Sequence, residues 1–140
     1  MKSTLRPGTS RTNHITIGRE RTIGFMGEEA RTYATPSMIL DIEHTCRELI
    51  LQHADAGEDS VGMEVAVKHL APTLMGMTVE ITVRVAAVEG RKVSFEAAVR
   101  DELDEVGAGT HARFVIDKAK TLERLKTKAA RFAALSGRAP

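Results

Sequence analysis

The pattern of hydrophobic and polar positions is clearest over residues 35–53, the longest segment with an apolar stripe at helical spacing. Pro36 suits the first helical turn, where a missing N–H costs nothing, and Thr35 before it fits the N-cap position. The pattern predicts one long helix from Thr35 to His53. Glu43 lies on the stripe, and a carboxylate there must be paired, protonated or used in chemistry. The apolar positions recur every three or four residues: Met38, Ile39, Ile42, Cys46, Leu49 and Ile50.

Alternation of apolar and polar residues follows the helix and predicts four strands, over about residues 61–71, 79–87, 93–99 and 106–116. In the first of these strands, His69 shares a face with the valines, and Gly62 falls on the opposite face. In the last strand, alternation places His111 and Arg113 outward on a solvated edge. A bulge at Gly107 or Gly109 could instead turn these two side chains inward.

Alternation from Asn13 to Ile17 predicts a first strand, which is followed by the long helix and then by four strands joined by short turns. Because helices do not alternate with strands, we expect an α+β fold in which a five-stranded antiparallel sheet packs around one long central helix. Residues 1–12 are predicted to be a flexible N-terminal arm, residues 13–116 the domain, and residues 117–140 an amphipathic C-terminal helix and tail. Residues 24–30 form a loop that could cover a site. The long outer strands need pairing, which favours a homodimer joined through edge strands.

Composition and charge limit the classes of partner and cofactor that we expect. A formal net charge of +1 argues against nucleic acid bound through bulk positive charge. The single Cys46 excludes a disulfide within the chain, and no Cys/His pair stands at ligand spacing, so we expect no metal or other cofactor. No apolar run of about 18 residues and no leader segment occurs, so we expect no membrane partner and a cytoplasmic location. The basic side chains of the C-terminal helix are expected to be a solvated face, with phosphate binding as the alternative.

Four residues could carry chemistry, and each also has a purely structural interpretation. Glu43 could act as base or nucleophile, or it could turn to solvent or pair with Arg47 one helical turn away. His69 could face Glu43 and activate a water, or be an ordinary core histidine. Thr35 could hold a substrate near the helix start or only cap the helix. Gly62 could be a simple glycine near a turn, or it could let a ligand carbonyl reach its backbone N–H.

These candidates stand at fixed spacings, with Glu43 eight residues after Thr35 and His69 seven residues after Gly62. Three further segments accompany them: Ala71-Pro72-Thr73, Val88-Glu89-Gly90-Arg91 and the run from Asp104 to Arg113. Together they resemble the fluoroacetyl-CoA thioesterase family of the hot-dog fold, over about residues 35–116.

The resemblance implies a homodimeric acyl-CoA thioesterase whose sheets join edge to edge, with acyl-CoA between helix and sheet at the dimer interface. Thr35, Glu43 and His69 would then be the catalytic residues. Glu43 would attack the thioester or activate water, His69 would act as general base or orient the water, and Thr35 would position the substrate. The Gly62 N–H would polarise the carbonyl. Arg113 matches a family arginine, which we place among the substrate-binding residues.

One departure concerns the loop ahead of the helix. The fluoroacetyl-specific enzyme of that family closes its pocket with a phenylalanine-bearing lid, whereas residues 26–31 contain no Phe here, and the nearest aromatic residues are Phe25 and Tyr33. We therefore expect hydrolysis of a small acyl-CoA thioester, without assigning fluoroacetyl-CoA as the substrate. A non-catalytic acyl-CoA-binding hot-dog dimer is the alternative, and a hot-dog hydratase or dehydratase is a third possibility.

Overall fold

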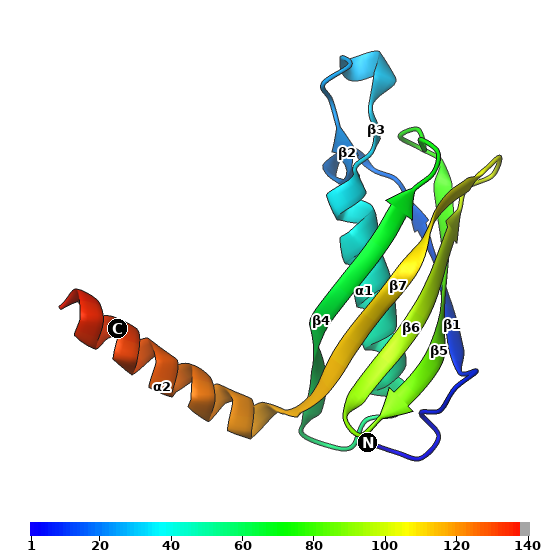
Figure 1. Cartoon of the computed structure of the whole chain (residues 1–140). Coiled ribbons are helices and arrows are strands. Elements are labelled where there is room, and N and C mark those ends of the chain that lie inside the picture. Colours follow the sequence, from blue (N-terminus) through cyan, green and yellow to red (C-terminus); the bar gives the residue numbers. More distant parts are fainter. Residues whose placement is uncertain (138–140) are drawn as a thin grey trace.

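The computed structural model describes residues 1–137. It contains a five-stranded antiparallel sheet, a long helix against one face of that sheet, and a second helix that projects away (Figure 1). The predicted α+β arrangement is therefore confirmed. The elements are β1 (Ser10–Thr16), β2 (Thr22–Ile23), β3 (Thr32–Tyr33), α1 (Thr35–Gln52), β4 (Glu58–His69), β5 (Thr78–Glu89), β6 (Lys92–Arg100), β7 (Glu105–Asp117) and α2 (Lys118–Ser136).

The sheet has the strand order β1-β5-β6-β7-β4, so β1 and β4 are its two open edges. The apolar stripe of α1 is buried against the sheet, as its spacing predicts. Each fully buried aliphatic side chain contributes about 1.5–3 kcal/mol, so the helix is held firmly along its length. The buried residues are Met38, Ile42, Cys46, Leu49 and Ile50 of α1 and Val79, Ile81, Val83, Val85, Phe95 and Val99 of the sheet.

The N-terminal segment packs against the domain, which differs from the arm predicted over residues 1–12. β1 already begins at Ser10, and Leu5 is buried in the core. The α-amino group of Met1 lies 2.6 Å from the carboxylate of Glu58. A single leucine among polar residues has no periodicity, so no pattern in this segment signals the contact.

A two-stranded hairpin of β2 and β3 precedes α1 and stands above the N-terminal end of that helix in Figure 1. The loop predicted over residues 24–30 is the tip of this hairpin and includes a short 3-10 turn, Glu28–Ala30. Each strand of the hairpin has only two residues, too few for an alternating pattern, which is why the sequence analysis did not find it. Phe25 at the tip is 79% exposed.

The two strands that carry predicted site residues depart from simple alternation. The register of β4 against β7 shifts between Gly62 and Glu64, which marks a β-bulge. The extra residue puts Gly62 on the same, helix-facing side as His69, although the two residues are an odd seven positions apart. In β7, His111 and Arg113 are buried rather than outward. The predicted phase of β7 is therefore wrong, because two inward positions of this strand carry polar side chains.

The predicted C-terminal helix is present as α2. The Asp117 side chain accepts a hydrogen bond from the Lys120 backbone N–H (3.0 Å) at its start, and Gly137 ends it in the left-handed conformation (φ 62°). Its far end projects away from the sheet (Figure 1), and Leu122 and Leu125 are exposed. The end of the predicted tail, residues 138–140, lies outside the described residues. Neither helix in the described chain is long and apolar enough to cross a membrane.

Candidate active site

Thr35 and His69 form one half of the candidate site. The residue before Thr35, Ala34, takes the N-cap position of α1, and no side chain caps this helix. The Thr35 hydroxyl instead lies 2.7 Å from Nδ1 of His69 at the end of β4. The N-cap role expected for Thr35 is therefore wrong, because its hydroxyl is engaged by the histidine.

The other ring nitrogen of His69, Nε2, is buried and has no hydrogen-bond partner among the described residues. Burial lowers the pKa of this imidazole from its ordinary value of 6.5, which favours the neutral ring. Tyr33 meets the ring edge-on, with 6.3 Å between ring centroids and an angle of 81°. His69 is thus held from two sides and keeps one nitrogen for a ligand or a water.

A cavity of about 450 Å³ opens beside Thr35 and His69. Its wall comes from the β2–β3 hairpin, the start of α1 and residues 70–72. Phe25 lines the cavity from the hairpin tip, whereas Tyr33 is buried and donates a hydrogen bond to the buried carboxylate of Asp41 (2.6 Å). Of the two aromatic residues that flank residues 26–31, only Phe25 is therefore exposed enough to cover the cavity.

Glu43 lies in the other half of the site, among Gly62, His111 and Arg113. Its side chain is 31% exposed, and its Oε1 is 3.9 Å from Arg113 Nη1 and 3.9 Å from His111 Nε2. A Cβ added at Gly62 would lie 2.8 Å from this oxygen, so glycine is what allows the carboxylate to approach the β4 backbone. The alternative pairing with Arg47 does not occur, because Arg47 forms two hydrogen bonds with an aspartate of β4.

Arg113 is fixed on three sides. Its Nε donates to the Ser60 hydroxyl (2.7 Å), its Nη2 to the Ser60 carbonyl oxygen (2.8 Å), and its Nη1 lies 3.2 Å from His111 Nε2. The side chain is only 7% exposed, and burial lowers the pKa of the guanidinium. An arginine nevertheless keeps its charge in proteins, so a rigid buried cation faces the carboxylate of Glu43.

The two halves are apart within one chain. Thr35 and Glu43 are two helical turns from each other, about 12 Å along the helix axis. Gly62 and His69 are about 23 Å apart along an extended strand. No hydrogen bond or ion pair joins Glu43 to His69 within the described chain, so the direct pair that the sequence left open does not form there.

Three residues that support these side chains were not predicted from the sequence. No pattern singles out Ser60, Tyr33 is noted only as an aromatic residue near the loop ahead of the helix, and alternation places His111 outward. A polar residue on an inward strand face could have signalled Ser60 and His111, once the phase of each strand was known. Nothing in the sequence pattern marks Tyr33, because its role depends on a hairpin too short to be seen.

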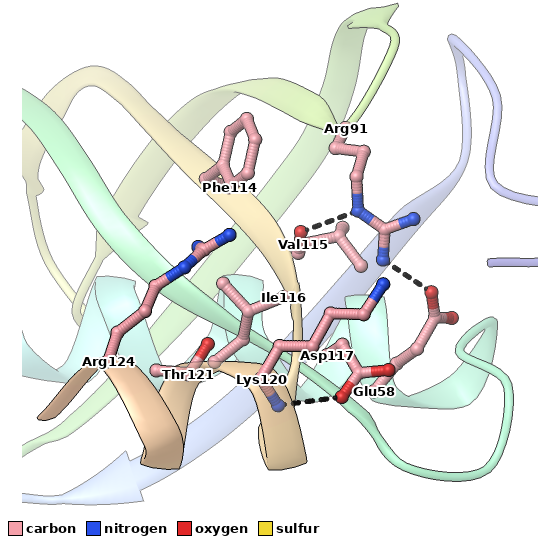
Figure 2. Close-up of a pocket in the computed structure, with 9 residues that line it drawn as sticks. All are labelled: Glu58, Arg91, Phe114, Val115, Ile116, Asp117, Lys120, Thr121 and Arg124. Atoms are coloured by element: carbon pink, nitrogen blue, oxygen red, sulfur yellow. Dashed lines mark hydrogen bonds and ion pairs between the residues drawn. The ribbon is translucent and has the colours of Figure 1, made fainter. Parts of the chain in front are cut away.

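A second cavity, of about 420 Å³, lies at the base of α2 and contains none of the predicted site residues (Figure 2). Lys120 and Arg124 line it together with Arg91, which donates to a backbone carbonyl of β7 (2.8 Å) and to Glu58 (2.6 Å). With Asp117 also lining it, two carboxylates offset much of the positive charge, so this cavity does not single out a phosphate site. In the part of the chain that the structure describes, no group of three or more His, Cys, Asp or Glu residues could hold a metal ion.

Sequence comparison relates the chain to one group of enzymes. Residues 17–119 match the family model described as fluoroacetyl-CoA-specific thioesterase. The fluoroacetyl-CoA thioesterase of Streptantibioticus cattleyicolor is 30% identical over 135 residues, which covers 91% of this chain and 97% of that protein.

Solved structures agree with this relation. A variant of the fluoroacetyl-CoA-specific thioesterase in complex with fluoroacetate and CoA superposes with a TM-score of 0.77 at 31% identity, covering 84% of this chain and 99% of the other. A Thermus thermophilus protein described as a thioesterase superfamily member gives 0.85 at 28% identity, covering 93% and 97%. A hot-dog-like protein from Thermanaerovibrio acidaminovorans gives 0.80 at 24% identity, covering 87% and 91%, which agrees with the predicted hot-dog fold.

Proposed function

Because this chain belongs to the fluoroacetyl-CoA-specific thioesterase family, we propose that it is a thioester hydrolase that cleaves a small acyl-CoA thioester to the free acid and CoA. The observation that carries the proposal is the position of Glu43. Its carboxylate sits against the backbone at Gly62, with the buried cation of Arg113 behind it. The backbone at Gly62 is open to a ligand because glycine has no side chain. A partly exposed carboxylate beside it is suited to react with a carbonyl group bound at this position.

The complete site, we infer, forms between two copies of the chain. β4 is an open edge strand of twelve residues, and apolar side chains along it, including Met63 and Val65, are exposed. Such an edge invites pairing with a second strand. Antiparallel pairing of two β4 strands, about a two-fold axis midway between Gly62 and His69, would set His69 opposite the partner subunit's Gly62.

This pairing would complete two equivalent sites. Each site would combine Thr35 and His69 of one subunit with Glu43, Gly62 and Arg113 of the other. The separation of the two halves within one chain supports this arrangement, because a thioester group is far too small to contact both halves of the same chain.

The chemistry assigned to each group follows from its surroundings. Hydrolysis breaks the carbon–sulfur bond, gives the acyl carbon a hydroxyl group and releases the sulfur as the CoA thiol. Glu43 attacks the carbonyl carbon or takes a proton from the attacking water, and both roles need the same position. The Gly62 N–H stabilises the oxyanion, a contribution of about 2.7–4 kcal/mol for one such donor. His69, neutral and with Nε2 unpartnered, orients the attacking water or takes its proton in place of Glu43, while Thr35 fixes the His69 ring. The proton that the water gives up ends on the departing sulfur, which leaves as the thiol.

The acyl group, in this proposal, occupies the cavity beside Thr35 and His69. Phe25 would cover it from the hairpin tip, in a role that differs from a lid phenylalanine within residues 26–31. Glu28 at the same tip pairs with Arg19 and Arg31. A cytoplasmic location stays a prediction, supported by the buried, free thiol of Cys46.

A panel of acyl-CoA esters that differ in chain length and polarity tests the proposal, with release of free thiol as the readout. Wild-type protein should hydrolyse short esters, and Glu43→Gln and His69→Ala should each lose most of that activity. Both variants should keep the wild-type thermal midpoint and mass in solution. Activity that survives both substitutions would refute the assigned site. Saturable binding of CoA esters without turnover of any of them would favour the non-catalytic alternative.

A further inference from the structure

His111 is a buried titratable side chain next to Glu43, and the chemistry described so far does not use it. Its side chain is 1% exposed, and it faces groups of β4, of its own strand β7 and of α1. Nδ1 lies 2.8 Å from the backbone carbonyl oxygen of Glu64, beside the bulge in β4. Nε2 lies 3.2 Å from Nη1 of Arg113 and 3.9 Å from the Glu43 carboxylate.

These two partners determine where the ring carries its proton. A carbonyl oxygen can only accept a hydrogen bond, so Nδ1 must carry the hydrogen. A guanidinium can only donate, so Nε2 must present its lone pair to Arg113. His111 is therefore the neutral Nδ1–H tautomer. Burial and the adjacent guanidinium lower the pKa of this imidazole, which agrees with a neutral ring.

The neutral His111 ring helps to determine the direction in which the Arg113 guanidinium points. Ser60 takes one hydrogen from Nε and one from Nη2, which fixes one side of the guanidinium plane. His111 takes a hydrogen from Nη1, the nitrogen nearest to Glu43. The carboxylate is thus left at 3.9 Å from Nη1, beyond hydrogen-bond distance but within reach of the positive charge. A direct hydrogen bond from Arg113 would instead tie up the lone pairs that Glu43 needs for attack or proton transfer.

We propose that His111 is a positioning residue of the thioesterase site, which accepts a hydrogen bond from Arg113 and so keeps the guanidinium from binding the Glu43 carboxylate directly. This inference rests on the proposed function for its catalytic consequence. Its structural part, the neutral Nδ1–H ring bonded to Arg113, does not depend on any substrate.

The structural part is tested on wild-type protein by nitrogen NMR of the histidine rings at neutral pH. The expected result is a His111 ring with a slowly exchanging proton on Nδ1 and an unprotonated Nε2. A ring with its proton on Nε2, or with protons on both nitrogens, would overturn the inference. Because no substrate is involved, this result stands apart from whether the protein hydrolyses any acyl-CoA.

The catalytic part is tested by three substitutions and a double-mutant cycle. His111→Leu removes the acceptor and should lower kcat by about 100-fold with little change in KM, since misplacement of a catalytic group by about 1 Å costs that much. His111→Gln offers an amide oxygen near the position of Nε2 and should recover most of the loss. His14→Leu, on the exposed edge strand β1, is the matched control and should leave kcat unchanged.

The cycle separates positioning from a general packing defect. If His111 acts through Arg113, His111→Leu should have no further effect on kcat in an Arg113→Met background. An undiminished loss in that background would contradict the proposal, as would wild-type kcat in a folded His111→Leu protein. A wild-type protein without turnover would remove the proposed function, while the NMR result would still decide the state of the ring.

Discussion

Replacing Gly62 with alanine perturbs the geometry of the site with the smallest possible change. A Cβ at this position would lie 2.8 Å from Glu43 Oε1, 3.4 Å from His111 Cε1 and 3.7 Å from Arg113 Nη1. Only the first of these contacts is impossible, so the carboxylate must retreat by about 0.5–1 Å to reach an ordinary contact distance. A shift of about 1 Å at a reacting group lowers the rate by about 100-fold, or about 2.7 kcal/mol in the barrier.

The same substitution should not harm folding. Gly62 does not have a positive φ, so alanine fits its backbone without strain, and the close contact is with the end of a flexible side chain. Replacing a strand glycine by alanine favours the folded state by about 0.5–1 kcal/mol. We therefore expect Gly62→Ala to lose kcat and to keep or slightly raise its thermal midpoint.

Gly90→Ala is the matched control. Gly90 has φ 63° at the turn between β5 and β6, and a Cβ there would meet nothing within 4 Å. Alanine in this left-handed conformation costs about 1–2 kcal/mol, so this variant should lose stability and keep kcat. Thiol-release kinetics and thermal unfolding of both variants are the assays. Wild-type kcat in Gly62→Ala, or a loss of kcat accompanied by a loss of stability as large as in Gly90→Ala, would refute the reasoning.

Three further predictions concern the cavity, the core and pH. Phe25→Ala should raise KM for acyl-CoA severalfold without moving the thermal midpoint, because the side chain is exposed and lines the cavity; steady-state kinetics across the ester panel measure this. Tyr33→Phe keeps the ring against His69 but removes the hydrogen bond to Asp41, so the free energy of unfolding should fall by about 1–3 kcal/mol in denaturant melts while kcat is retained. Burial lowers the pKa of His69 and His111 below the ordinary 6.5, so the folded protein binds fewer protons than the unfolded chain in acid. The free energy of unfolding should therefore fall as the pH drops below about 6.5 and stay level from there to about pH 8, and a flat profile between pH 5 and pH 8 would contradict this.

Patterns that repeat along the chain were sufficient to predict most of the fold. The stripe on α1 and the alternation in β5 and β6 each repeat over several turns or residue pairs, and each reflects burial against the same core. Glu43 was found for the opposite reason, because a carboxylate interrupts such a stripe. The hairpin of β2 and β3 was not predictable in this way, since two residues cannot show a period.

The site itself was predictable only in part, for physical reasons. The bulge between Gly62 and Glu64 adds one residue to β4, and nothing in the local sequence shows that it must. The inward face of β7 carries His111 and Arg113, so a rule that places apolar residues inward reverses the phase of that strand. The pairing of Thr35 with His69, rather than of Glu43 with His69, depends on the distance along α1 and could not be read from spacing alone.

The central claim is that each active site combines residues of two subunits, and mixing inactive variants tests it most directly. Glu43→Gln and His69→Ala homodimers, each inactive, are mixed and allowed to exchange subunits. If the sites are shared, half of the dimers become mixed and each mixed dimer has one intact site, so about one quarter of wild-type activity should return. Mixing Thr35→Val with His69→Ala, which damage the same half of the site, should restore nothing. No recovery in the first mixture, with subunit exchange confirmed by mass, would contradict the account.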